Sequence, residues 1–332
     1  MMLTRIDIEN YMNLVTTSFI LDSKNAVIYG ENGVGKTNLC RTLSLLKKML
    51  FSELSYEGAS SLELSNCSLV YHFSSTDQLC YTIKFDNRGA LCFEELQINN
   101  TTLYAYSHSS NDYLLEHFED YKLSKPQVGD YIAYDIIMPI LRLMFNSGDY
   151  NSAIGKMMSE IFSWIVIDGV NLCTKNAIIT QSYEVSVLNG LLDKTGIHLD
   201  LRTNNDSELT LMLDTKKGYL PFNKVASTGE RAIVNLTLEI NRHKACSLLC
   251  IDEFDAFYHY NLAKRMLLEV IPQLGDQYIL TTHNTSFLNL IDYNTIYILN
   301  KSGCHHLTEL TNRKLIPGLN FEHLFRAGEF NV

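Results

Sequence analysis

An eight-residue segment from Gly30 to Thr37, with the sequence GENGVGKT, constrains this chain more than any other feature. It fits the pattern G-x-x-x-x-G-K-[ST] at every fixed position. An apolar run, Ala26–Tyr29, precedes it and a helical pattern from Asn38 to Leu50 follows it, which is the strand–loop–helix context that the pattern requires. A glycine-rich turn that fits by chance is the alternative interpretation. The context favours a loop that holds phosphate groups.

The residue types of this loop fit the binding of a nucleotide. Gly30, Gly33 and Gly35 let the backbone turn its N–H groups inward around a β-phosphate, and the following helix N-terminus adds its dipole. Lys36 is expected to reach the β- and γ-phosphates, and the hydroxyl of Thr37 is expected to hold Mg²⁺. The motif therefore predicts a nucleotide-binding protein.

Length, charge and cysteine content narrow the class of protein. The 332 residues suffice for one large domain, or for one core with an inserted lobe. A net charge of −10 argues against a broad nucleic-acid-binding surface, although it does not exclude a local one. The eight cysteines form no C-x-x-C pair, which favours reduced thiols in a cytoplasmic protein. Neither a signal peptide nor a membrane-spanning apolar stretch is visible, so we expect no membrane partner.

A run of short strands is expected between residues 68 and 104. The ranges Ser68–Phe73, Leu79–Phe85 and Ala90–Ile98 read as strands, and polar turn residues separate them. This pattern predicts an antiparallel meander.

Residues 106–204 are expected to form an inserted helical lobe. Ile154, Met157, Ile161 and Ile165 recur there at helical spacing, which we interpret as core packing rather than a ligand pocket. Proline and glycine residues interrupt any sustained heptad, so a long coiled-coil arm is not expected.

The chain after residue 205 alternates between strands and helices. A hairpin is expected around Lys216–Gly218, followed by helices over 230–244 and 260–274 and strands over 247–251, 277–281 and 295–300. This alternation indicates a largely parallel, doubly wound sheet. Residues 1–105 and 205–332 are thus expected to be the two halves of one α/β domain.

An acidic pair, Asp252 and Glu253, follows the apolar strand expected at 247–251. Open α/β sheets bind ligands at the carboxyl ends of their strands. Asp252 is expected to hold Mg²⁺, directly or through water, and Glu253 to take a proton from an attacking water. Without a preceding phosphate-binding loop, such a pair would more often be only a strand end.

His283 follows the strand expected at 277–281, in the sequence Thr281-Thr-His-Asn284. This position places an imidazole near a γ-phosphate, where it could hydrogen-bond the phosphate or the water. A single histidine at a strand end is usually structural, but its order after Asp252 and Glu253 favours a catalytic role.

Ser227-Thr-Gly-Glu-Arg231 opens the helix that precedes the acidic strand. Ser227 can cap this helix, and Gly229 lets backbone N–H groups approach an anion. The alternative is an ordinary helix cap, with Thr228 or Ser227 at the cap and Glu230 in the first turn. Taken alone, this segment favours the ordinary cap.

In this order the four segments resemble the ABC-type ATPase heads of the SMC/RecF/OLD group. Gly30–Thr37 is similar to Walker A, residues 226–231 to the signature motif, 249–253 to Walker B and His283 to the switch histidine. The opening segment, residues 6–11, is similar to the first strand of these heads. Residues 218–222 and 257–259 resemble the stand-alone ATPases of the OLD-like branch. The resemblance covers roughly residues 1–100 and 205–310.

The resemblance extends the expected nucleotide-binding set. Asn32 and Asn38 match the asparagines of this branch's Walker A, and Ser227, Gly229 and Glu230 match its signature motif. Gln97 is a candidate for the Q-loop glutamine that contacts the metal. The sequence departs from the SMC pattern at His259, where those heads carry an aspartate, and no nuclease domain follows His283.

The resemblance implies an ATPase that uses ATP and Mg²⁺, expected to be slow. Two heads would enclose two nucleotides head to tail, so that Ser227 and Gly229 of one chain contact the γ-phosphate bound by Lys36 of the other. ATP would then favour a closed homodimer or higher homo-oligomer, which hydrolysis opens.

The sequence also leaves open a non-enzymatic scaffold that binds ATP and hardly hydrolyses it. Three biological roles remain open. The first is a sensor or scaffold that controls a separate effector, a nuclease or toxin, in bacteriophage defence; a complete ATPase set without a nuclease or long arm favours it. The second is a RecF/SMC-like DNA-binding ATPase in repair or maintenance. The third, least favoured, is the nucleotide-binding subunit of a transporter, which would need a membrane partner.

Overall fold

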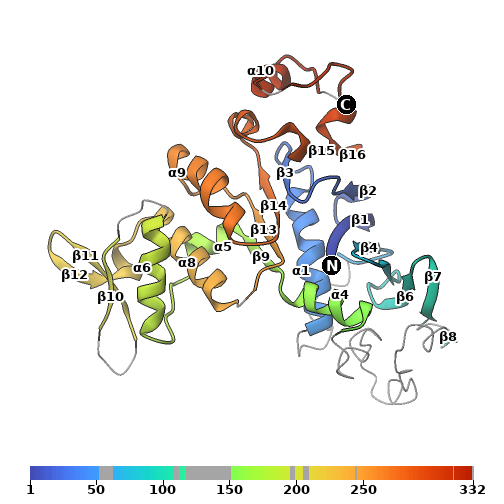
Figure 1. Ribbon diagram of the computed structural model, residues 1–332, viewed down its shortest axis with the longest axis horizontal. Coiled ribbons are helices and arrows are strands. Elements are labelled where there is room, and N and C mark those ends of the chain that lie inside the picture. The colour runs from blue at the N-terminus through green and yellow to red at the C-terminus, as the bar shows by residue number, and fades with distance from the viewer. Residues whose placement is uncertain are drawn as a thin grey trace.

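The computed structural model describes residues 1–51, 63–107, 112–116, 151–194, 199–204, 209–243, 245–316 and 318–330. The described strands form a seven-stranded, a six-stranded and a three-stranded sheet (Figure 1). Helix α1 (Lys36–Phe51) packs between the two larger sheets, with its buried side chains in one core with both. The protein is therefore a mixed α/β structure.

The seven-stranded sheet is antiparallel throughout, in the order β2-β1-β4-β5-β6-β7-β8. Its strands are β1 (Met2–Tyr11), β2 (Leu14–Ile20), β4 (Ser68–Ser74), β5 (Gln78–Phe85), β6 (Leu91–Ile98), β7 (Thr101–Ser107) and β8 (Asp112–Leu115). The predicted meander is confirmed by β4, β5 and β6. The structure adds β7 through a turn at Asn99 and Asn100, whose φ values of 50° and 64° suit a two-residue hairpin.

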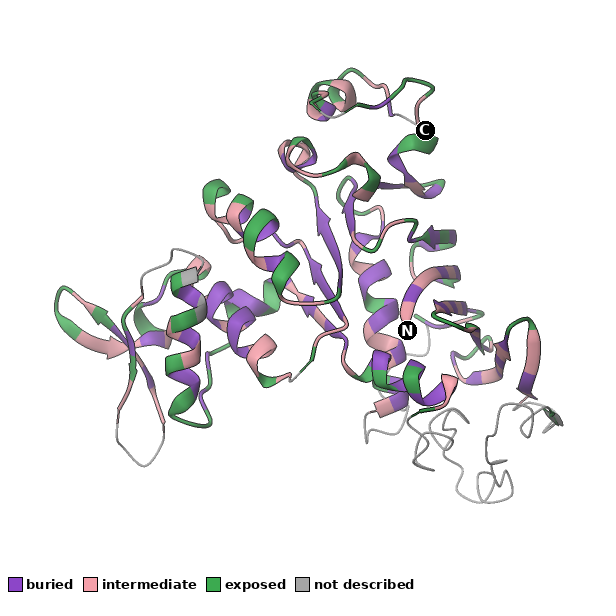
Figure 2. Ribbon diagram, viewed as in Figure 1, coloured by how far each residue is buried: buried purple, intermediate pink, exposed green. Residues whose placement is uncertain are grey.

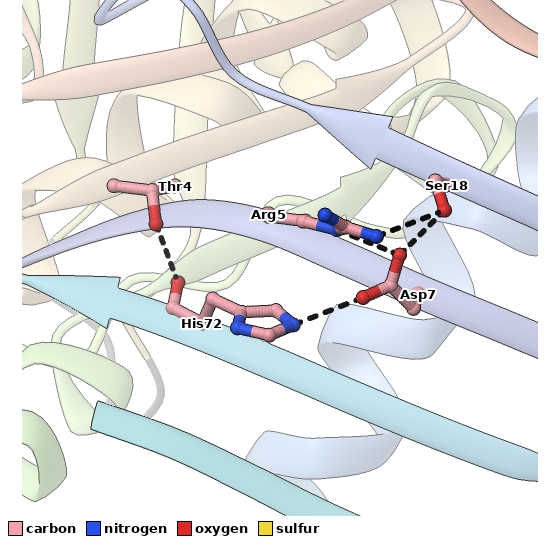
Figure 3. A network of polar contacts seen from close by, with 5 residues as sticks. All are labelled: Thr4, Arg5, Asp7, Ser18 and His72. Carbon is pink, nitrogen blue, oxygen red and sulfur yellow. Dashed lines mark hydrogen bonds and ion pairs between the residues drawn. The ribbon is translucent and has the colours of Figure 1, made fainter. Parts of the chain in front are cut away.

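A network of polar contacts links β1, β2 and β4 (Figure 3). Asp7 accepts hydrogen bonds from Arg5 Nε at 2.8 Å and Ser18 Oγ at 2.5 Å, and its other oxygen lies 2.9 Å from His72 Nε2. Thr4 Oγ1 donates to the carbonyl of His72 at 3.1 Å. Burial raises the pKa of Asp7, but the bonds from Ser18, Arg5 and His72 outweigh it, so the pKa is lowered overall.

The six-stranded sheet has the order β16-β15-β3-β14-β13-β9. Its strands are β3 (Ala26–Tyr29), β9 (Ile165–Asp168), β13 (Leu248–Asp252), β14 (Gln277–Thr282), β15 (Ile296–Asn300) and β16 (Gly303–His306). All neighbouring pairs are parallel except β15 and β16. The predicted, largely parallel sheet is confirmed.

Both faces of the central strands are buried, which explains why these strands are almost wholly apolar (Figure 2). Ala26 and Ile28 of β3 point into the core that contains α1 and the seven-stranded sheet. Val27 points into a second core on the opposite face. This second core contains side chains of α5 (Gly169–Thr174), α6 (Tyr183–Lys194), α8 (Thr228–Arg242) and α9 (Tyr260–Arg265).

The remaining described elements flank these layers. Helix α4 (Ala153–Phe162) packs on the α1 side, and the predicted hairpin is confirmed as β11 and β12. The three-stranded sheet contains β10 (Leu201–Thr203), β11 (Leu211–Thr215) and β12 (Gly218–Pro221), followed by α7 (Phe222–Val225). Helix α10 (Phe321–Arg326) belongs to a small third core near the C-terminus. Within the described ranges, no helix combines the length and apolarity needed to cross a bilayer.

The described parts of the interval 106–204 contain strands as well as helices. Ile154, Met157 and Ile161 are buried in α4, as the core-packing interpretation predicts. Ile165, however, begins strand β9, which pairs with β13 in the central sheet, so its assignment to the same helical stripe is wrong. Three parts of this interval, 108–111, 117–150 and 195–198, lie outside the described residues. The division of the chain at residues 105 and 204 stays a prediction.

Candidate functional site

Three adjacent parallel strands end at the same edge of the central sheet. Strands β3, β14 and β13 end at Tyr29, Thr282 and Asp252. The phosphate-loop motif follows β3, His283 follows β14 and Glu253 follows β13. Segments more than 200 residues apart in the sequence thus meet where parallel α/β sheets bind ligands (Figure 1).

At two positions, the loop between β3 and α1 has a backbone conformation that favours glycine. Gly33 and Gly35 have φ values of +81° and +114°. A Cβ atom at Gly35 would lie 2.5 Å from a methyl carbon of Leu14, and one at Gly30 would lie 2.7 Å from the carbonyl oxygen of Leu299. The glycines predicted from the motif therefore meet a steric requirement of this loop.

Lys36 is the first residue of α1, and its side chain is buried under the loop. Its Nζ donates to the carbonyl oxygens of Gly30 at 2.7 Å and Glu31 at 2.9 Å. Burial lowers the pKa of Lys36, and the carboxylates of Glu253, Asp252 and Asp255 oppose this shift. Lys36 therefore lies within the electrostatic reach of the acidic residues that follow β13.

Asn13, which the sequence reading missed, braces this loop from the turn between β1 and β2. Its Nδ2 donates to the carbonyl of Gly33 at 2.6 Å, and its Oδ1 accepts from Asn38 Nδ2 at 2.7 Å. Asn38 thus contacts Asn13 and supports the loop, while Asn32 is exposed at its tip. No local pattern marks Asn13, because its partners follow about twenty residues later.

Asp252 and Glu253 are held by a residue of the neighbouring strand. The hydroxyl of Thr281 donates to Asp252 Oδ1 at 2.5 Å and accepts from the backbone N–H of Glu253 at 2.8 Å. Asp252 is buried, with 4% of its surface exposed. Thr281 is a second residue that the sequence reading missed, although it stands two positions before His283.

The backbone at Glu253 adopts a conformation that is rare for residues other than glycine. Its φ is +50°, in the left-handed region. The start of α5 packs closely against this turn, because a Cβ at Gly169 would lie 2.6 Å from the carbonyl oxygen of Asp252. Strained backbone at the end of a buried strand is a feature that clusters at functional sites.

His283 and Asp255 complete this edge of the sheet. His283 is exposed directly after β14. Asp255 is 9% exposed, burial raises the pKa of its carboxyl, and its Oδ1 has no hydrogen-bond partner. Its signal in the sequence is the second aspartate of Asp252-Glu-Phe-Asp255, which the motif does not include.

The signature-like residues cap α8. Ser227 Oγ accepts from the N–H of Glu230 at 3.3 Å, and a carboxylate oxygen of Glu230 accepts from the N–H of Ser227 at 2.7 Å. Ser227 and Glu230 thus form a capping box, as the interpretation of this segment as an ordinary helix cap predicts. Gly229 packs against the turn after β13, since a Cβ there would lie 3.0 Å from the carbonyl of Phe257.

Two predicted parts of the site, residues 227–230 and Gln97, lie apart from the phosphate loop. Between the described residues, no hydrogen bond joins either of them to this loop. Helix α8 belongs to the core opposite α1, so Ser227, Gly229 and Glu230 do not meet the loop of their own chain. Gln97 lies on β6 between Leu96 and Ile98, which point into the α1 core, so it points away from that core. Its amide donates to Glu95 at 3.1 Å.

The described residues fit a Mg²⁺-bound nucleoside triphosphate. Residues 31–33 of the loop are exposed, and a Cβ atom at Gly33 would meet no atom within 4 Å, so this part of the loop is open to a ligand. Lys36 Nζ bonds only to carbonyl oxygens, which phosphate oxygens can replace. The hydroxyl of Thr37 and the buried carboxylate of Asp252 are hard oxygen ligands of the kind that Mg²⁺ prefers.

Comparison with known proteins identifies the fold. A scan against models of protein families finds no match, and a search of curated proteins finds none either. Among solved structures, an SMC head bound to the C-terminal winged-helix domain of ScpA is 14% identical, with a TM-score of 0.51 over 92% of this chain and 96% of that chain. An SMC head domain from Thermotoga maritima is also 14% identical, with a TM-score of 0.46 over 90% and 94%. The chain has the fold of an SMC head, an ABC-type ATPase fold.

Proposed function

We propose that the protein is an ABC-type ATPase that binds ATP with Mg²⁺ at residues 30–37 and hydrolyses it. The observation that carries this proposal is the placement of Lys36 within reach of Asp252 and Glu253 at one sheet edge. Hydrolysis needs a phosphate-binding cation, a metal ligand and a base at one place. The fold brings these three groups together from segments far apart in the sequence.

Each residue has a role that follows from its position. Lys36 and the N–H groups of the loop bind the β- and γ-phosphates, while Thr37 and Asp252 hold Mg²⁺. The metal neutralises charge that builds on the phosphate oxygens. Glu253 takes the proton of the attacking water, and Thr281 fixes its backbone through the bond to its N–H. His283 contacts the γ-phosphate from the end of β14.

We further propose that ATP joins two copies head to tail. Residues 227 and 229 have no hydrogen bond to the loop of their own chain among the described residues, and Ser227 is exposed. The N-terminus of α8 can therefore bind the γ-phosphate held by a second copy. Glu230 supports this role by holding the N–H of Ser227. Because only ATP carries the γ-phosphate, the closed dimer forms with ATP and opens after hydrolysis.

For the biological role, we propose a sensor or scaffold whose ATP state controls a separate effector protein, a nuclease or toxin in bacteriophage defence. The SMC head solved with the winged-helix domain of ScpA supports a head of this fold as a carrier of a partner protein. The net charge of −10 also favours a protein partner over DNA. A DNA-binding ATPase of the RecF/SMC kind is the second candidate, favoured only by the same fold.

Two variants test these proposals. Glu253→Gln removes the base and is expected to abolish turnover while retaining ATP-dependent dimers, whereas Lys36→Ala is expected to weaken nucleotide binding itself. Turnover at the wild-type rate in Glu253→Gln would show that the catalytic assignment is wrong. Purification of Glu253→Gln with ATP, expressed with its genomic neighbours, tests the role. A stoichiometric protein released by ADP supports the sensor, and nuclease-sensitive DNA without a protein supports the repair-type ATPase.

A further inference from the structure

Asp255 carries a buried oxygen atom that has no partner. Its side chain is 9% exposed, yet Oδ1 accepts no hydrogen bond. A buried acceptor left without a donor is costly, and such atoms are rare in folded proteins. The atom therefore requires a donor that arrives in another state of the site.

The position of Asp255 is fixed from two sides. The turn that carries it is anchored by the N–H of Phe254, which donates to the carbonyl of Thr281 at 3.1 Å. The carboxyl of Asp255 is within hydrogen-bonding reach of the Thr282 side chain. Asp255 thus lies against the end of β14, next to the residue that precedes His283.

The loop that carries His283 is also fixed, although the imidazole is exposed. The N–H of Asn284 donates to Thr282 Oγ1 at 3.0 Å, and Asn284 Oδ1 accepts from the N–H of Ser286 at 3.1 Å. Anchors on both sides leave only the side-chain torsions of His283 free to change. Its ring is already close enough to interact electrostatically with Asp255.

Two other side-chain donors of this region do not suit Asp255 Oδ1. Lys36 Nζ bonds to two loop carbonyls and is required for the phosphates. The hydroxyl of Tyr258 also has no partner, but Cys173 on α5, and not Asp255, contributes with burial to the raised pKa of Tyr258. The imidazole of His283 is exposed and acts electrostatically on Asp255, which makes it the candidate donor for Oδ1.

We infer that Asp255 is a positioning residue for His283: one ring N–H of His283 donates to Asp255 Oδ1, and the other ring nitrogen is thereby held toward the γ-phosphate. This inference rests on the proposed ATP site. A carboxylate that holds one ring nitrogen fixes the orientation of the ring, as second-layer carboxylates do for catalytic and metal-bound histidines. ADP lacks the γ-phosphate, so the contribution of this pair appears with ATP alone.

The test measures ATP and ADP affinities by calorimetry, with Mg²⁺ and in the Glu253→Gln protein so that hydrolysis does not interfere. Asp255→Asn keeps the shape of the side chain but cannot satisfy both Thr282 and His283. It is expected to lower the ratio of ATP to ADP affinity roughly tenfold, the effect of one charge-assisted hydrogen bond, without changing ADP affinity. His283→Ala is expected to lower the ratio similarly.

The double variant separates positioning from independent effects. If Asp255 acts through His283, Asp255→Asn causes no further loss in the His283→Ala background. An unchanged ratio in Asp255→Asn, an equal loss of ADP affinity, or losses that multiply in the double variant would each overturn the inference. Asp255→Leu, which fills the same buried space without an acceptor, serves if Asp255→Asn does not fold. If the Glu253→Gln protein binds neither nucleotide, or Lys36→Ala binds both normally, the ATP site itself is wrong and this inference falls with it.

Discussion

Replacing Thr281 by valine should damage the acidic end of β13 although the change conserves volume. The side chain of Thr281 is fully buried, and its hydroxyl serves Asp252 Oδ1 at 2.5 Å and the N–H of Glu253 at 2.8 Å. Valine keeps the shape and removes both bonds. The substitution therefore removes the hydrogen-bond donor of the buried Asp252 carboxylate. It also removes the acceptor for the backbone N–H of Glu253, where the backbone is strained.

The magnitude follows from the two bonds. A hydrogen bond to a charged group contributes about 1.5–3 kcal/mol and a neutral one about 0.5–1.5 kcal/mol, so Thr281→Val should lower the free energy of unfolding by about 3 kcal/mol. Thr281→Ser is the matched control, because it keeps the hydroxyl and loses one buried methyl group, worth about 1 kcal/mol. Chemical denaturation followed by circular dichroism measures both variants.

Turnover should separate these variants more clearly than stability does. With the N–H of Glu253 unanchored, we expect Thr281→Val to lower kcat roughly tenfold or more at saturating ATP, since a misplaced base loses alignment with the attacking water. Thr281→Ser should keep most of the wild-type kcat. The reasoning is refuted if valine destabilises the protein no more than serine does, or if both variants turn over equally.

Three further perturbations test other parts of the structure. Asn13→Ala should weaken nucleotide affinity several-fold while changing the free energy of unfolding by less than about 1 kcal/mol, because its exposed amide braces the loop at Gly33; unchanged affinity would contradict that role. Gly35→Ala should abolish nucleotide binding and destabilise the protein by about 2 kcal/mol, given its φ of +114° and the clash with Leu14; normal ATP binding would argue against it. The lowered pKa of Asp7 stabilises the fold above the pKa of the unfolded carboxyl, and this contribution is lost as pH falls through the folded-state pKa. Asp7→Asn should therefore cost about 1 kcal/mol at pH 7 and nothing at a pH below both values, and an equal loss at both pH values would contradict the assignment.

Local sequence was sufficient wherever the chemistry lies within one contiguous segment. The strand–loop–helix arrangement around residues 30–37 was predicted correctly because the strand, the glycine turn and the start of α1 are neighbours in the chain. The strand order of the meander followed from alternation and from short turns. The capping box at Ser227 and Glu230 was readable for the same reason, because its two hydrogen bonds span three residues.

The tertiary structure decided what long-range packing controls. The spacing of Ile165 predicts a continuation of α4, because a buried helix and a buried strand both fit it. Only the pairing of β9 with β13 shows that this residue begins a strand. The roles of Asn13 and Thr281 could not be predicted for a related reason. Each acts on a residue of another element, and no local pattern records which elements lie side by side.

Sequence alone therefore predicted which residues of this protein bind phosphate and which acids act with them. That follows because the loop motif and the acidic pair each occupy consecutive positions in the chain. Only the fold decided that Lys36, Asp252 and Glu253 meet at one edge, and that Asn13 and Thr281 hold them there. The physical reason is that hydrogen bonds reach about 3 Å, so their partners are set by the packing of sheets and helices rather than by distance along the chain.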